Sequence, residues 1–197
     1  MAITLDGTAG INTSGSLTTT GSVISGSTIT STSSLTTGTG AVYNGLQAST
    51  AVASTSGTSI DFTAIPSWVK RITVMLSNIS TNGGNGLQIQ LGTGSTTYTT
   101  TGYNGSCGAA GAFTPFSSAF VITNTVVAAR NYFGQLILSN LTSNNWIESS
   151  NIGSTNDNTV WNSGGGITLG AVLTAIRITT INGIDTFDAG SINILYE

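Results

Sequence analysis

The chain has 197 residues, of which 39% are hydrophobic and only 6% are charged, and its net charge is −3. Soluble domains usually carry about 25% charged residues, but no apolar run approaches the roughly 20 residues of a membrane-spanning helix, so we expect no membrane insertion. Nucleic-acid binding needs clustered cations, and the only basic residues are Lys70, Arg71, Arg130 and Arg177, so no nucleic-acid partner is expected.

The first residues, Met1-Ala-Ile-Thr-Leu-Asp6, have neither the basic n-region nor the apolar h-region of a secretory signal peptide. We therefore expect synthesis in a cytoplasm without export by that route.

Residues 1–55 form the first predicted region, in which aliphatic side chains recur at every sixth position: Leu5, Ile11, Leu17, Val23, Ile29 and Leu35. An even spacing puts all of them on one face of an extended strand, whereas six residues of an α-helix rotate by roughly 600°. No charged residue occurs from Gly7 to Ile60. One aliphatic residue in six cannot form a core alone, so this strand must stack on copies of itself.

Two architectures satisfy that requirement, a one-chain β-solenoid and three intertwined chains. Six repeats make only about two turns of a three-sided solenoid, fewer than the roughly three repeats that such stacks need. Three chains would instead share the aliphatic residues around one axis and cover each other's edges. We therefore favour a trimeric stem whose axis the six aliphatic residues line, and the solenoid stays open.

Residues 56–197 form the second predicted region, where aromatic and charged residues appear. Alternating apolar runs separated by Gly, Asn and Ser turns predict strands at residues 67–76, 87–91, 119–123, 132–139, 145–149, 168–180 and 191–196. In the clearest of them, Leu87, Ile89 and Leu91 face the core. Short strands without intervening helices predict an all-β head with a β-sandwich or jelly-roll-like fold.

The chain has few residues of the types that usually act in catalysis. The chain has no histidine, which excludes a Ser-His-Asp hydrolase. Only Asp185 and Asp188 are acids close in sequence within the head, and they lie in a turn-like segment, so we interpret them as side chains that cap the turn. A calcium ion is the less favoured alternative, because it needs six to eight oxygen ligands and only two acids are present, and no metal site is predicted. Cys107 is the single cysteine, so we interpret it as a small buried hydrophobic residue. No catalytic residue and no cofactor is predicted.

Several aromatic residues have amide or hydroxyl neighbours, as a neutral sugar surface requires. Tyr98, Tyr103, Asn104 and Trp161 are the candidate contacts for a receptor or glycan. The alternative is that they belong to the core or to a subunit interface, which is the interpretation we favour for Trp146.

Two segments carry a resemblance to a known family. Residues 59–76 (SIDFTAIPSWVKRITVML) and 176–197 (IRITTINGIDTFDAGSINILYE) resemble the C-terminal domain of tail-fibre and related virion fibre proteins of tailed bacteriophages. Residues 3–11 also resemble the repeat segments of phage fibres, whereas residues 92–159 are less similar. The resemblance implies a homotrimer with a fibrous stem and a distal β-rich head, and it carries no active site.

These observations lead to the hypothesis of a structural virion fibre, located in the virion after assembly in the host cytoplasm. Residues 1–55 would attach to other virion proteins, and the head would contact a host surface glycan or protein. A capsid-decorating head fibre without a receptor role is the alternative. A polysaccharide-degrading enzyme is disfavoured by the short chain and its few acids.

Overall fold

The computed structural model describes residues 35–36, 42–43 and 45–197, and the chain divides into two units between Tyr43 and Asn44. In the first unit, β1 (Leu35–Thr36) pairs antiparallel with β2 (Val42–Tyr43). Leu35 of the predicted stem axis therefore begins a strand. The other predicted axis residues, Leu5, Ile11, Leu17, Val23 and Ile29, lie outside the described residues, so the trimeric stem stays a prediction.

The larger sheet of the second unit has nine strands. They are β3 (Gln47–Ala48), β4 (Val52–Ala53), β6 (Arg71–Thr81), β8 (Asn104–Ala109), β9 (Ala112–Phe116), β11 (Tyr132–Thr142), β12 (Asn145–Ser154), β13 (Val160–Thr168) and β15 (Phe187–Tyr196). Their order is β3-β15-β6-β11-β12-β13-β8-β9, and β4 also pairs with β15. Residues 47–53 thus join the head sheet, whereas the predicted boundary between the two regions follows residue 55.

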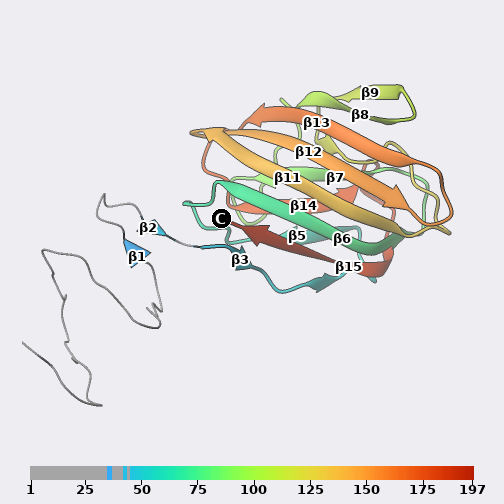
Figure 1. The fold of residues 1–197 in the computed structure, drawn as a ribbon, viewed down its shortest axis with the longest axis horizontal. Coiled ribbons are helices and arrows are strands. Elements are labelled where there is room, and N and C mark those ends of the chain that lie inside the picture. The colour runs from blue at the N-terminus through green and yellow to red at the C-terminus, as the bar shows by residue number, and fades with distance from the viewer. Residues whose placement is uncertain (1–34, 37–41, 44) are drawn as a thin grey trace, which may run out of the picture. The chain divides into compact units, whose positions relative to one another are not determined.

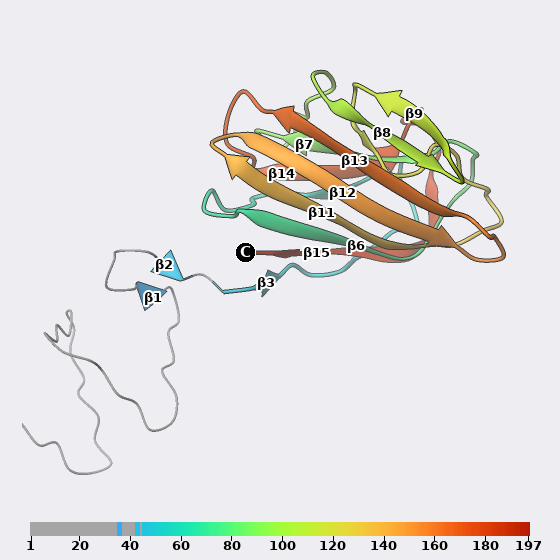
Figure 2. The same ribbon diagram turned by 45° about the horizontal axis from the view of Figure 1, so that its top comes forward.

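The smaller sheet has four strands, β5 (Ser59–Phe62), β7 (Leu87–Gly92), β10 (Phe120–Val121) and β14 (Ala175–Thr180). Their order is β10-β7-β14-β5, and all pairings in both sheets are antiparallel. In Figures 1 and 2, β7 and β14 lie behind β11 and β12. The described residues contain no helix, which confirms the all-β prediction.

The hydrophobic core lies between the two sheets because each strand turns alternate side chains inward. The small sheet contributes Ile89 and Ile178, and the large sheet contributes Ile72, Leu136 and Ile152, all fully buried. One contiguous cluster includes residues of both sheets, which is the packing of a β-sandwich.

Two predicted strands begin later than the sequence suggested. Residues 67–70 do not join β6, because the Val69 amide closes a turn by donating to the Pro66 carbonyl at 3.1 Å. Residues 169–174 connect β13 to β14 and do not continue either strand. Among the described residues, no helix is long and apolar enough to cross a membrane.

Candidate functional site: a polar groove on the four-stranded sheet

The outward face of the four-stranded sheet is polar across three neighbouring strands. Strand register aligns Asp61 of β5 and Gln90 of β7 on either side of Arg177 in β14. A second row aligns Ser59, Thr179 and Gln88 in the same way. The alternation that turns Ile89 and Ile178 into the core therefore turns two rows of hydrogen-bonding side chains to the other face, where Gln88 and Thr179 are buried and the row of Asp61, Arg177 and Gln90 is more accessible.

Arg177 is the best-anchored side chain of this face. Its guanidinium makes two parallel hydrogen bonds to the Asp61 carboxylate, Nε to Oδ1 at 2.9 Å and Nη2 to Oδ2 at 2.8 Å. Hydrogen bonding to the carboxylate raises the pKa of Arg177, so the guanidinium stays charged at neutral pH. A bidentate pair of this kind fixes the plane of the guanidinium.

Tyr98 supports the guanidinium from one side. The Arg177 Cζ atom lies 4.1 Å from the centroid of the Tyr98 ring, a cation–π contact. The Tyr98 hydroxyl oxygen is buried without a hydrogen bond at normal distance, although it is close enough to Asp61 to feel its charge. Burial first, and then the Asp61 carboxylate, raises the pKa of Tyr98. Tyr98 is therefore half-buried and acts as a platform under Arg177.

A groove of about 240 Å³ opens beside Arg177. Its lining is mostly polar: Thr58, Ser59, Gln88, Gln90, Arg177, Thr179, Ile181, Asn182 and Gly183. Two of these groups are held in place, because Gln88 Nε2 donates to the Thr180 carbonyl at 3.2 Å and Thr179 Oγ1 donates to the Thr58 carbonyl at 2.8 Å.

The chemistry of the groove suits neutral hydroxyl groups. The Arg177 charge is balanced by Asp61, so the remaining polar side chains of the groove are neutral amides and hydroxyls, which can donate or accept hydrogen bonds. Concave sites of this composition orient a ligand through a few fixed polar groups. The groove can therefore read the hydroxyl pattern of a sugar.

The structure separates the four predicted contact residues. Tyr98 lies beside the groove, whereas Asn104 is exposed at the start of β8, opposite Gly166 of the large sheet. Trp161 lies half-buried in β13 and packs against the core. They do not form one surface.

Tyr103 is a core residue, which was the alternative interpretation. It is 3% exposed, and its ring meets Phe120 edge-on with centroids 4.9 Å apart. Its hydroxyl accepts a hydrogen bond from the Leu91 amide at 2.8 Å and donates to the Thr99 carbonyl at 3.2 Å. Burial raises the pKa of Tyr103 to about 12. Trp146 is likewise buried at 3% exposure, as the sequence suggested.

The Asp185 carboxylate has amide partners. It accepts hydrogen bonds from Asn182 Nδ2 at 2.7 Å and from both the backbone amide and Nδ2 of Asn85. Hydrogen bonding from Asn182, followed by Asn85, lowers the pKa of Asp185. Asp188 is exposed, and the described residues contain no group of three acids, cysteines or histidines that could hold a metal ion. Asp185 therefore ties the loop before β15 to the loop before β7.

The buried side of the large sheet holds a second polar cluster. Ser163 Oγ donates to Glu148 Oε1 at 2.7 Å, and Ser150 Oγ lies 2.7 Å from Ser163 Oγ. Glu148 is 5% exposed, and burial raises its pKa to about 7. Cys107 pairs with Ser163 across β8 and β13 and is fully buried, as predicted; burial raises the pKa of its thiol to about 12. An inaccessible neutral thiol is a poor nucleophile.

Sequence reasoning missed most of the groove. A signal was present for Gln88 and Gln90, because the alternation that predicts an inward Leu87, Ile89 and Leu91 also places the two glutamines outward. Asp61 and Arg177 are 116 positions apart in the sequence, and no local sequence pattern predicts that they pair.

Comparison of the chain with protein-family models, with curated proteins and with solved structures finds no match.

Proposed function

We propose that the chain is a structural, non-enzymatic virion fibre protein of a tailed bacteriophage whose head binds a host surface glycan through the groove beside Arg177. The groove is the observation that supports a binding role most directly. It presents fixed amide and hydroxyl groups around a guanidinium that Asp61 and Tyr98 hold in one plane. Preorganised groups of this kind lose little conformational entropy when a ligand binds.

The virion role rests on sequence features. These are the resemblance of residues 59–76 and 176–197 to phage fibre heads, and the six-residue repeat of the first 55 residues. In this proposal the repeat forms a trimeric stem that attaches to other virion proteins.

Glycan binding is tested on an array of bacterial surface polysaccharides probed with the labelled full chain. We expect binding that Gln90→Ala reduces, because that change removes an amide from the groove and leaves the core strand intact. Gln135→Ala is the matched control, since Gln135 is an exposed glutamine on β11 in the other sheet. Absence of binding by the chain and by whole virions, or equal loss from both variants, would overturn the receptor claim.

The trimeric stem is tested by light scattering of the full chain. Leu17→Ser or Val23→Ser should weaken the trimer, because each change places three polar side chains on the predicted axis. Thr20→Ser lies outside the repeat register and is the control. The head should unfold at the same temperature in all variants. If the Leu17 and Val23 variants still form normal trimers, these residues do not line the trimer axis.

The position on the particle is tested by electron microscopy of virions labelled with antibody against the head. Label at the tail supports the receptor-binding fibre. Label distributed over the capsid would replace it with a decorating fibre.

A further inference from the structure

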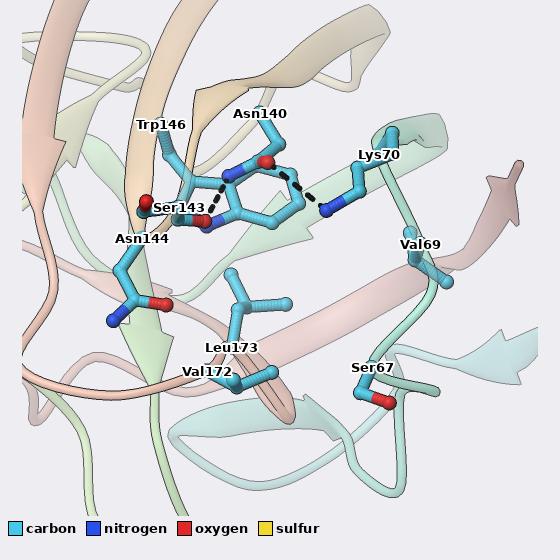
Figure 3. A pocket seen from close by; sticks show the side chains of 9 residues that line it. All are labelled: Ser67, Val69, Lys70, Asn140, Ser143, Asn144, Trp146, Val172 and Leu173. Carbon is cyan, nitrogen blue, oxygen red and sulfur yellow. Dashed lines mark hydrogen bonds between the residues drawn. The ribbon is translucent and has the colours of Figure 1, made fainter.

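A small recess lies where three distant segments of the head meet, separate from the groove. The segments are the turn before β6, the turn between β11 and β12, and the loop between β13 and β14, and the recess holds about 60 Å³. Figure 3 shows side chains of all three segments around this space.

The floor of the recess is apolar. Val69, Trp146 and Leu173 line it, and each is only 3% exposed. Val172 adds an apolar wall that is 47% exposed. Because the floor residues belong to the packed core, the recess keeps its shape without a ligand.

The rim is polar and held in position. Asn140 Nδ2 donates to the Ser143 carbonyl at 2.8 Å and to the Asn145 carbonyl at 3.2 Å. Both amide hydrogens are therefore in use, and the Oδ1 atom is turned toward Lys70, whose Nζ donates to it at 3.3 Å (Figure 3). The ammonium group is thus tethered at the edge of the recess.

The charge of Lys70 is the unusual feature of this rim. The three arginines of the chain each pair with a carboxylate, Arg71 with Glu197, Arg130 with Asp157 and Arg177 with Asp61. Within residues 45–197, the Lys70 ammonium makes no salt bridge and donates only to a neutral amide oxygen. An ammonium has three hydrogen-bond donors, so two remain for an incoming anion.

The size of the recess decides which part of a ligand enters. About 60 Å³ is room for a few water molecules, and therefore for one substituent but not for a hexose ring. A carboxylate fits this space and finds the ammonium at its edge. The ring that carries it would rest on the exposed Val172 side and meet the polar groups of Ser67 and Asn144.

We infer that this recess binds the carboxylate of an acidic sugar, such as a uronic acid residue of a surface polysaccharide. The inference rests on the proposed glycan-binding function but assigns a different site and a different sugar class. The groove beside Arg177 would bind neutral hydroxyl groups of a polysaccharide, and the recess would favour polysaccharides that also carry carboxylates.

The test is an NMR titration of the isotope-labelled full chain with glucuronic acid, and with glucose as the neutral probe. Glucuronic acid should shift the Trp146 indole signal and the backbone signals of residues 67–70 and 140–146, whereas glucose should not. Lys70→Gln should weaken glucuronic acid binding by up to about fivefold, the range of one exposed charge pair, and Lys70→Arg should retain it. Equal shifts with both sugars, or unchanged affinity of Lys70→Gln, would overturn the inference.

A second pair of variants tests the location. Val172→Asp places a carboxylate on the wall of the recess and should weaken glucuronic acid binding. Val160→Asp is the matched control, because Val160 is an exposed valine on β13 at 52% exposure outside the recess. Equal effects of the two variants would show that overall charge matters and not the recess.

The two sites can fail independently. Gln90→Ala should leave glucuronic acid binding unchanged. If Gln90→Ala abolishes binding on the array while Lys70→Gln leaves the affinity for glucuronic acid unchanged, the assignment of the recess is refuted and that of the groove is supported. If glucuronic acid binds at the recess while Gln90→Ala reduces the binding of no polysaccharide, the assignment of the groove as a glycan site is refuted.

Discussion

The two sheets of the head differ in where they place polar and apolar side chains. The four-stranded sheet has an apolar inner face and an outer face with Asp61, Arg177 and Gln90. The large sheet buries the carboxyl group of Glu148 and turns apolar side chains such as Ile147 and Val160 toward solvent.

This difference shows that an inward strand position does not always hold an apolar side chain. In the small sheet, alternation separates apolar inward side chains from polar outward ones, although Gln88 and Thr179 of the outward rows are themselves buried. In β12, Trp146, Glu148 and Ser150 all point inward, so a polar pair lies within an otherwise apolar face. Ser163 satisfies one oxygen of Glu148, but Oε2 is buried without a hydrogen bond. The large sheet therefore buries a carboxyl group with incomplete hydrogen bonding on its core side.

The largest expected effect concerns the inner face of the small sheet. Ile178→Ala removes a fully buried side chain between Ile60 and Ile89 and should cost about 2–5 kcal/mol of unfolding free energy. The matched control is Ile147→Ala, because Ile147 is 47% exposed on the outer face of β12 and should cost less than about 1 kcal/mol. Urea denaturation measures both, and similar losses would contradict the assignment of the two faces.

Glu148 gives a pH-dependent effect. Its pKa is about 7 in the folded head and 4.5 when exposed, so between these values the unfolded chain ionises while the folded chain holds the proton. Folding stability should therefore fall as pH rises from about 4.5 to 7, by about 3 kcal/mol in total. Glu148→Gln cannot ionise and should remove that decline.

The measurement is urea denaturation of the wild type and Glu148→Gln at several pH values between 4 and 8. Asp188→Asn is the control, because Asp188 is an exposed acid and its loss should leave the decline in place. A wild-type stability that rises through this range would show that Glu148 is ionised in the folded head.

The sequence predicted the apolar strands well and the glycine-rich ones poorly. β7 was predicted because Leu87, Ile89 and Leu91 form a clear apolar face, and the structure confirms it. β13 was missed because Gly164, Gly165 and Gly166 present no side chain pattern. A glycine is required there, since a Cβ atom on Gly165 would lie 2.8 Å from the Asn104 carbonyl oxygen and 2.9 Å from the Phe116 ring.

The candidate site was predictable only in part. Tyr98 was selected as an aromatic residue in a polar loop; its ring stacks on Arg177, which lines the groove, and its contact with a ligand stays a prediction. Tyr103 satisfied the same criterion but is buried, because its hydroxyl finds backbone partners at Leu91 and Thr99. Local composition cannot distinguish these two tyrosines, since the difference depends on long-range packing.

A smaller effect is expected for the ion pair on the outer face of the small sheet. Asp61→Asn should cost about 1 kcal/mol or less, because the Asp61 and Arg177 side chains are 31% and 32% exposed and solvent screens their attraction. Urea denaturation at low and high salt tests this, since high salt should shrink the difference between the variant and the wild type. A large cost that salt does not change would mean that the pair behaves as buried.

The smallest effect is expected for Tyr98→Phe. Its hydroxyl is buried without a hydrogen bond at normal distance, so its removal breaks no such bond and should change stability by no more than about 0.5 kcal/mol. Tyr98→Ala should cost more, because it removes the ring on which the Arg177 guanidinium rests. Polysaccharide binding should follow the same order, unchanged in Tyr98→Phe and weakened in Tyr98→Ala, because the groove depends on the position of Arg177. A clear loss of polysaccharide binding in Tyr98→Phe would instead show that the hydroxyl contacts the bound sugar. The sugar would then lie closer to Asp61 than proposed.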